Sequence, residues 1–203
     1  WLSPITEVIL GSQVGIIRRL LGRHDVLPPK SGKLERVEWL SFACVMIRRE
    51  VFAEVGMMDE GYFMYSEDID YCRRAGVAGW KMAREDEARV VHFHGQSSGI
   101  KSGALPKDRR RPRYCYASRS RYYKKFYGRP GLVLANVLRT FGWCFSLCRG
   151  LLVKKEGGHT AKGEYFDIWT DCWTPLRDEV GAFPHDVGLP EGANEERQAG
   201  TRL

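Results

Sequence analysis

The sequence predicts an α/β protein, because short apolar runs typical of strands alternate along the chain with segments typical of helices. Residues 37–47 form an apolar, β-branched run, and residues 80–82 and 88–93 form two shorter runs. Two predicted helices lie between these runs, at residues 48–55 and 66–75. With 203 residues, 43% of them hydrophobic, the chain can bury one sizeable core.

The N-terminal part of the sequence predicts two helices with defined breaks. Residues 1–22 carry apolar positions at helical spacing, and Gly11 and Gly15 are expected to interrupt this amphipathic helix. A loop rich in proline and glycine follows. The helix predicted over residues 48–55 is expected to end at Gly56, because glycine adopts the backbone conformation that terminates helices.

The next predicted helix begins at Ser66, a residue type that caps helix N-termini, and carries three acids in its first turn: Glu67, Asp68 and Asp70. The helix macrodipole stabilises carboxylates at this end. Spacing alone favours a structural role, in which the acids cap the helix and Asp70 forms an exposed pair with Arg74. Such a pair contributes only about 0.3–0.5 kcal/mol.

A strongly basic segment lies in the second half of the chain. Residues 101–129 hold eleven Lys or Arg against the single acid Asp108, a local charge of +10 in a chain whose net charge is +7. This predicts an anionic partner, either phosphate groups, a lipid surface or nucleic acid. The apolar helix predicted over residues 132–153 contains Arg139 and Arg149, which argue for a core or interfacial helix rather than a bilayer-spanning one.

The remaining features concern compartment and chain ends. The six cysteines show no CxxC pair, no zinc-type spacing and no dense disulfide framework, which favours a reducing cytosol. The sequence begins with Trp1 rather than Met, and we expect it to be a fragment of a longer protein. Beyond residue 156, only residues 164–173 are expected to be ordered, and the tail from Arg177 is expected to be mobile.

Five short motifs between Val37 and Ser98 carry a resemblance to a known family. In order, they are an apolar run ending in IRRE, then VF..VG..DE, F.Y.EDIDYC.R, G..GW and ARVVH..GQSS. Together they resemble the second half of family 2 glycosyltransferase domains of the rhamnosyltransferase-like kind. The resemblance continues more loosely back to Trp1 and forward through the basic segment. One position differs, because Phe42 stands where the family has a small glycine, and its ring would narrow the substrate pocket.

The resemblance implies the acceptor-side half of a GT-A-type, Rossmann-like glycosyltransferase fold. Residues 1–100 would form this half. Residues 101–156 would form a basic aromatic segment and an amphipathic helix at a membrane surface, and residues 157–203 would form a short ordered segment and a flexible tail.

The resemblance also implies roles for individual residues. Asp68 would be the base that takes the proton of the acceptor hydroxyl, and Glu67 would shape its field and contact the acceptor. Mutual repulsion with Asp70 would raise one pKa of the cluster towards a useful range. His92, with His94 as the alternative, would join the shell of a Mg²⁺ or Mn²⁺ ion beside the departing diphosphate. Six residues are expected to bind acceptor or substrate: Tyr62, Tyr65, Asp70, Arg74, Gln96 and Ser97.

The expected function is therefore that of a metal-dependent, inverting hexosyltransferase-type enzyme. It would transfer a sugar, with rhamnose favoured, from a nucleotide sugar to a polysaccharide or polyprenyl-diphosphate-linked acceptor in cell-envelope glycan synthesis. We expect a cytoplasmic protein that is peripheral at the inner face of the plasma membrane, with the basic segment on anionic lipid rather than on nucleic acid. The alternative is a non-catalytic remnant that binds an anion, a carbohydrate or nucleic acid.

Overall fold

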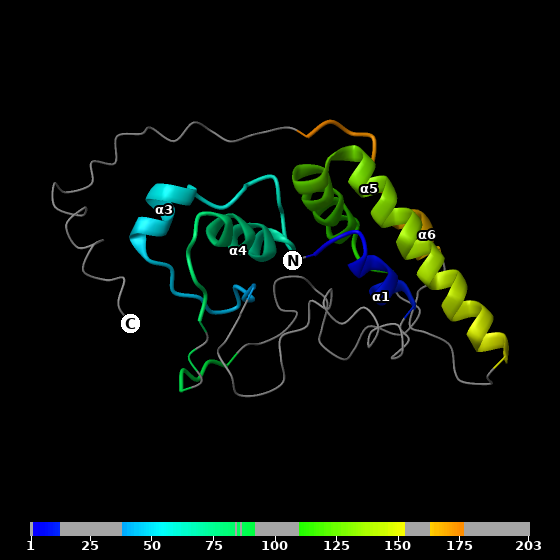
Figure 1. Cartoon of the computed structure of the whole chain (residues 1–203), viewed down its shortest axis with the longest axis horizontal. Coiled ribbons are helices and arrows are strands. Elements are labelled where there is room, and N and C mark those ends of the chain that lie inside the picture. The colour runs from blue at the N-terminus through cyan, green and yellow to red at the C-terminus, as the bar shows by residue number, and fades with distance from the viewer. Residues whose placement is uncertain are drawn as a thin grey trace.

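The computed structural model of the chain consists of helices joined by irregular segments. It describes residues 2–12, 38–83, 85, 87–91, 110–152 and 163–176. In these residues the helices are α1 (Thr6–Ser12), α3 (Arg49–Val55), α4 (Glu67–Val77), α5 (Arg113–Leu152) and α6 (Glu164–Asp167). Figure 1 shows α5 as a long bent helix, with α3 and α4 on the side of its first half and α1 against its second half.

Helices α3 and α4 share a small apolar core. Val51 of α3 packs with Tyr71 and Ala75 of α4, and Phe42 lies against the same cluster with its ring edge-on to Tyr71. The predicted end of α3 is confirmed, because Gly56 has a φ of 82° and its N–H donates to the carbonyl oxygen of Phe52. A positive φ of this kind favours glycine, which has no Cβ.

Helix α5 has two arms that meet at Gly128, where φ is 66° and ψ is −178°. Pro130 lies just beyond, and proline cannot donate the backbone hydrogen bond that a continuous helix needs. The first arm is residues 113–127 and the second arm is residues 129–152. The helix predicted over residues 132–153 is thus confirmed within the second arm, and the bend allows the two arms to lie on different parts of the molecule.

The main core joins distant parts of the chain. Its buried members come from the loop before α4, both arms of α5 and the segment after α6, and they are Tyr62, Tyr122, Tyr123, Leu132, Ala135 and Cys172. Leu2 and Trp169 pack against them. All three predicted divisions of the chain therefore contribute side chains to one core.

The predicted strands do not form in the described residues. Residues 38–47 are irregular, residues 80–82 contain one isolated bridge at Met82, and residues 88–91 are irregular. A strand exists only when a neighbouring strand completes its hydrogen bonds, and the part of the chain described here holds no such neighbour. The α/β, GT-A-type fold therefore stays a prediction.

Candidate active site

The acidic pair Glu67 and Asp68 occupies the first turn of α4, after an unusual backbone turn. The two preceding residues, Tyr65 and Ser66, have φ values of 68° and 69°. Ser66 stands at the N-cap position but its side chain makes no capping hydrogen bond, so the predicted capping role is wrong. Left-handed backbone in non-glycine residues costs about 1–3 kcal/mol each and is concentrated at functional sites. The strained turn fixes the direction in which the acidic pair leaves the loop.

Asp68 is half-buried, and its surroundings adjust its basicity. Burial raises the pKa of Asp68 above its ordinary value, while hydrogen bonds from the backbone N–H groups of Ile69 and Phe42 partly offset this effect. The Ile69 N–H lies 2.8 Å from Oδ1 of the carboxylate. A carboxylate with a raised pKa holds a proton more strongly, which is the property that a general base requires.

Glu67 is also half-buried, and its carboxylate is incompletely satisfied. Burial raises its pKa, and the neighbouring Asp68 charge acts in the same direction. Its Oε2 atom is buried without a hydrogen-bond partner among the described residues. The predicted repulsion within the acidic cluster is therefore present between Glu67 and Asp68, but burial is the larger cause of both raised pKa values.

Asp70 is directed into the protein rather than towards the surface. It is fully buried and accepts hydrogen bonds from the Tyr62 hydroxyl at 3.0 Å and from Nε of Arg74 at 2.7 Å. Nζ of Lys125 lies 2.7 Å from its second oxygen. The pair of Asp70 and Arg74 is thus not the exposed one expected, because Asp70 is buried and Arg74 is half-buried. Tyr62 and Arg74 are both hydrogen-bonded to Asp70. The role of these three residues in substrate binding stays a prediction.

Asp59 extends this network and ties the loop before α4 to the first arm of α5. Arg121 and Lys125 contact its carboxylate at 2.6 and 2.8 Å, and the N–H of Gly61 donates to it at 2.9 Å. Burial by itself would raise the pKa of Asp59, but these hydrogen bonds lower it to about 2. Further along the loop, the Ser118 hydroxyl donates to the carbonyl oxygen of Met64 at 2.8 Å.

Three aromatic rings form an exposed surface beside the acidic pair. Tyr65 is 42% exposed and its ring is parallel to that of Tyr114, with centroids 6.2 Å apart. Phe63 is 76% exposed and meets Tyr114 edge-on at 5.3 Å. Tyr62 is buried beneath Arg121, so its predicted stacking on an acceptor is not open to it in this structure. The alternation of Phe63 and Tyr65 was a sequence signal for this surface, whereas nothing in the sequence indicated Tyr114.

Several predicted site residues lie outside the described part of the chain: His92, its alternative His94, Gln96 and Ser97. Among the described residues, no group of three or more His, Cys, Asp or Glu side chains is arranged to hold a metal ion. Glu67 and Asp68 provide oxygen ligands of the kind that Mg²⁺ and Mn²⁺ accept, but two carboxylates alone do not make a site. The metal and its histidine ligand therefore stay predictions.

Most of the described charges of the basic segment have partners within the chain, some of them at the surface. Five of its side chains form ion pairs, which are Arg110 with Asp167, Arg113 with Asp171, Arg119 with Glu7, Arg121 with Asp59, and Lys125 with both Asp59 and Asp70. Lys124 and Arg129 donate to backbone carbonyl groups. These charges hold α5 to its neighbours, so the described part of this segment gives little support to the predicted anionic surface. Residues 101–109 lie outside the description.

Comparison with known proteins links the chain to sugar transferases. It is similar to the N-acetylglucosaminyl-diphospho-decaprenol L-rhamnosyltransferase of Mycobacterium tuberculosis, with 46% identity over 38% of this chain and 30% of that protein. It is also similar to the rhamnosyltransferase WbbL of Escherichia coli K12, with 35% identity over the same shares. The low-salt glycan biosynthesis hexosyltransferase Agl10 of Haloferax volcanii is 38% identical over 30% of this chain and 20% of that protein.

The matched region is a minor part of each relative, and the chain spans about 30% of the length of the first two. No protein-family model matches the chain, and no solved structure matches it.

Proposed function

We propose that the chain is the acceptor-side part of an inverting family 2 glycosyltransferase. It would transfer a sugar, with rhamnose favoured, from a nucleotide sugar to a polysaccharide or polyprenyl-diphosphate-linked acceptor in cell-envelope glycan synthesis. The names of the similar proteins support the sugar and the acceptor class. The observation that carries the proposal is the pair of adjacent, half-buried carboxylates with raised pKa values at the start of α4.

In this mechanism Asp68 is the general base. It accepts the proton of the acceptor hydroxyl while the hydroxyl oxygen attacks the anomeric carbon of the donor from the face opposite the nucleoside diphosphate. The bond to the diphosphate breaks, and the configuration at the anomeric carbon inverts. The raised pKa of Asp68 suits it to this step, because general bases work best when their pKa approaches the operating pH.

The neighbouring residues would orient the acceptor. The unpartnered Oε2 atom of Glu67 would accept a hydrogen bond from an acceptor hydroxyl. The rings of Phe63, Tyr65 and Tyr114 would pack against the apolar face of a sugar ring. A Mg²⁺ or Mn²⁺ ion, held in part by His92, would supply positive charge for the departing diphosphate. The protein would be cytoplasmic and peripheral at the inner face of the plasma membrane.

The test is the substitution Asp68→Asn in the intact enzyme. We expect turnover to fall about a hundredfold or more, about 3 kcal/mol, because the amide cannot accept the proton, while binding of the nucleotide sugar changes little. Glu60→Gln removes an exposed acid nearby and serves as the matched control. Turnover near the wild-type value in Asp68→Asn would exclude Asp68 as the base.

A further inference from the structure

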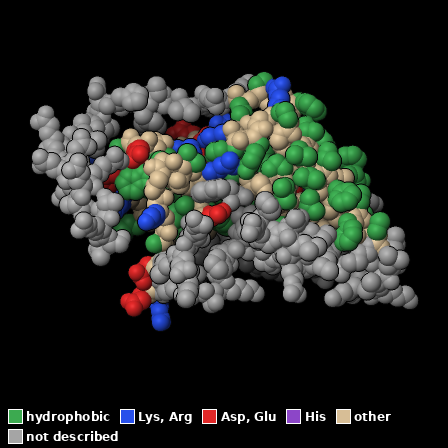
Figure 2. Space-filling view, viewed as in Figure 1, with side chains coloured by type: hydrophobic (Ala, Val, Ile, Leu, Met, Phe, Trp, Pro, Cys, Tyr) green, Lys and Arg blue, Asp and Glu red, His purple; other side chains and the backbone are tan. Residues whose placement is uncertain are grey.

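Beyond Pro130, the second arm of α5 presents an apolar outer surface. Between residues 131 and 148, every exposed residue is hydrophobic, and these are Leu134, Val137, Phe141, Cys144, Phe145, Leu147 and Cys148. Phe141 alone is 64% exposed. Figure 2 shows hydrophobic side chains gathered over this part of the molecule. A helix surrounded by water carries polar residues on its outer face, so this arrangement needs another explanation.

The polar residues of the same region lie inside. Glu7 of α1 is buried and accepts from Nε of Arg119 at 3.0 Å and from Nη1 of Arg139 at 3.2 Å. Asn136 is fully buried and accepts a hydrogen bond from Arg119 at 2.6 Å. In α1, Thr6 and Ser12 are buried together with Ile9, while Leu10 and the preceding Ile5 are exposed. Apolar side chains outside and paired polar ones inside are typical of helices in contact with lipid.

The contact between α1 and the second arm also has the form seen in membranes. The two helices cross at Gly11 and Gly142. A Cβ on Gly11 would lie 2.5 Å from the carbonyl oxygen of Arg139, and a Cβ on Gly142 would lie 2.8 Å from the carbonyl oxygen of Val8. Small residues that allow backbones to approach closely are enriched in helix contacts within lipid, where packing replaces the hydrophobic effect.

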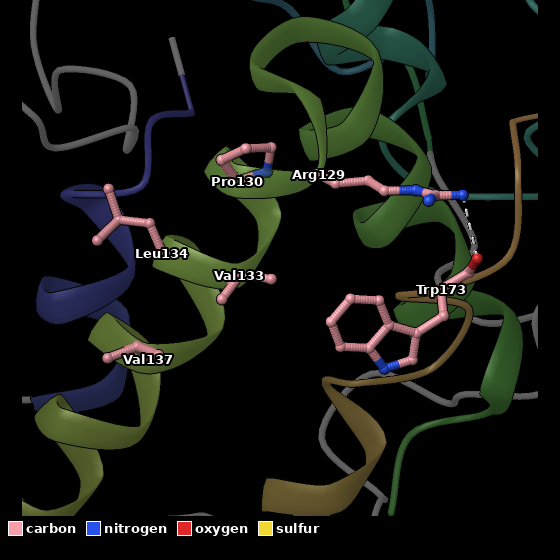
Figure 3. A pocket seen from close by; sticks show the side chains of 6 residues that line it. All are labelled: Arg129, Pro130, Val133, Leu134, Val137 and Trp173. Carbon is pink, nitrogen blue, oxygen red and sulfur yellow. Dashed lines mark hydrogen bonds between the residues drawn. The ribbon is translucent and has the colours of Figure 1, made fainter.

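An open apolar groove continues the exposed face at the bend of α5. It has a volume of ≈ 480 Å³, and its lining residues are Arg129, Pro130, Val133, Leu134, Val137 and Trp173. Figure 3 shows the Trp173 ring beside the helix and the Arg129 side chain reaching to the Trp173 carbonyl oxygen, 3.3 Å away. Trp173 is 70% exposed. Tryptophan and arginine at one end of an apolar face are typical of the headgroup level of a membrane.

We propose that the apolar face of the second arm inserts into one leaflet of a lipid bilayer, with Trp173 and Arg129 at headgroup level. Helix α5 is long and apolar enough to cross a membrane by length and composition. It would instead lie in the interface, because α1 and the segment after α6 cover its other sides. This inference rests on the proposed function, which places the protein at a membrane surface. It names insertion of apolar side chains, rather than attraction of basic residues to anionic lipid, as the membrane contact.

The first test measures binding of the 203-residue chain to neutral phosphatidylcholine vesicles by flotation. We expect binding that changes little between low and high salt, because burial of apolar surface is not screened by ions. Phe141→Ser/Phe145→Ser should lower the partition coefficient by about tenfold or more. Met46→Ser/Val77→Ser removes two apolar side chains elsewhere that are even more exposed, and should leave it unchanged. Circular dichroism checks that both variants fold.

The second test uses the wild-type chain and depends on neither folding of a variant nor sugar transfer. Cys144 and Cys148 lie on the inserted face, whereas the exposed Cys44 lies in the segment before α3. Neutral vesicles should slow the reaction of Cys144 and Cys148 with a soluble maleimide severalfold and leave that of Cys44 unchanged, as followed by peptide mass spectrometry.

Three results would overturn the inference. If vesicles leave the reaction rates of Cys144 and Cys148 unchanged, the apolar face stays in water. If the chain binds only anionic vesicles and high salt abolishes this binding, the basic residues rather than the apolar face make the membrane contact. Protection of Cys144 and Cys148 without lipid, together with concentration-dependent dimerisation in sedimentation, would make the face a contact between two copies of the chain.

Discussion

At the scale of single residues, the hydrogen-bond donors around a buried carboxylate decide whether its pKa is raised or lowered. Glu67 and Asp68 have raised pKa values because burial disfavours their charged forms and only backbone hydrogen bonds partly offset it. Asp59 lies a few residues away but is surrounded by donors, and its pKa is lowered to about 2. Acids of the same type, close together in one sequence, therefore have opposite properties.

The raised pKa of Asp68 predicts the acid side of the pH profile. Because only the deprotonated carboxylate accepts a proton, kcat/KM of the intact enzyme should rise with pH through an apparent pKa above the ordinary aspartate value of 3.8. Steady-state kinetics from pH 4 to 8 measures it, with Asp68→Asn as the comparison. An unchanged acid limb in that variant would contradict the assignment.

Asp59 predicts a pH dependence of stability. Its folded-state pKa of about 2 lies below the ordinary 3.8, so its contribution is fully present above pH 3.8 and is lost as the pH falls towards 2. After allowance for solvent screening, the contribution is about 1–2 kcal/mol. Asp59→Asn should lower the free energy of unfolding by this amount at pH 6 and by much less near pH 2, as measured by urea denaturation. Equal losses at both pH values would show that the charge is not the cause.

At the scale of elements, the contact between α1 and the second arm depends on two glycines. The backbone atoms of the partner helix lie within 3 Å of the position where a Cβ would stand on Gly142. Backbone cannot move aside as a flexible side chain can, so an added methyl group must push the helices apart.

Gly142→Ala should therefore destabilise the chain by about 1–3 kcal/mol, although alanine has the higher helix propensity. Thermal denaturation followed by circular dichroism measures this change. Cys144→Ala alters an exposed residue two positions away and should shift stability by less than about 0.5 kcal/mol. A more stable Gly142→Ala variant would mean that the two helices do not touch here.

At the scale of the whole molecule, Glu7 connects the N-terminal helix to both arms of α5. Arg119 lies on the first arm, Arg139 lies on the second, and the Tyr123 hydroxyl donates to the same carboxylate at 2.8 Å. Burial would raise the pKa of Glu7, but the two arginines hold it below its ordinary value. The angle between the two arms is thus braced by one buried acid.

Removing that charge should affect the whole fold. Glu7→Gln leaves two partly buried guanidinium groups without their anion and should cost about 3–5 kcal/mol of unfolding free energy. Chemical denaturation measures the loss, and Glu50→Gln, an exposed acid in the first turn of α3, should change stability by less than about 0.5 kcal/mol. A loss as small as that of the control would show that the ion pairs of Glu7 with Arg119 and Arg139 do not stabilise the fold.

The sequence alone determined the local features of this protein. The helices around residues 49–55 and 67–77, the end at Gly56 and the break between the arms follow from propensity, spacing and glycine conformation, which depend on neighbours within a few residues. The same holds for the position of Glu67 and Asp68 in a first helical turn.

The tertiary structure decided what each side chain faces. Lys125 reaches Asp59 and Asp70 more than fifty residues away in the sequence, and Arg139 reaches Glu7 across an even longer separation. Local periodicity carries no information about such partners. Spacing therefore placed Asp70 in an exposed pair, whereas its carboxylate is buried, and composition did not show that most described basic residues after residue 109 have partners within the chain. The predicted strands do not form in the described residues for the same reason. A strand depends on hydrogen bonds to a neighbouring strand, which local sequence does not specify.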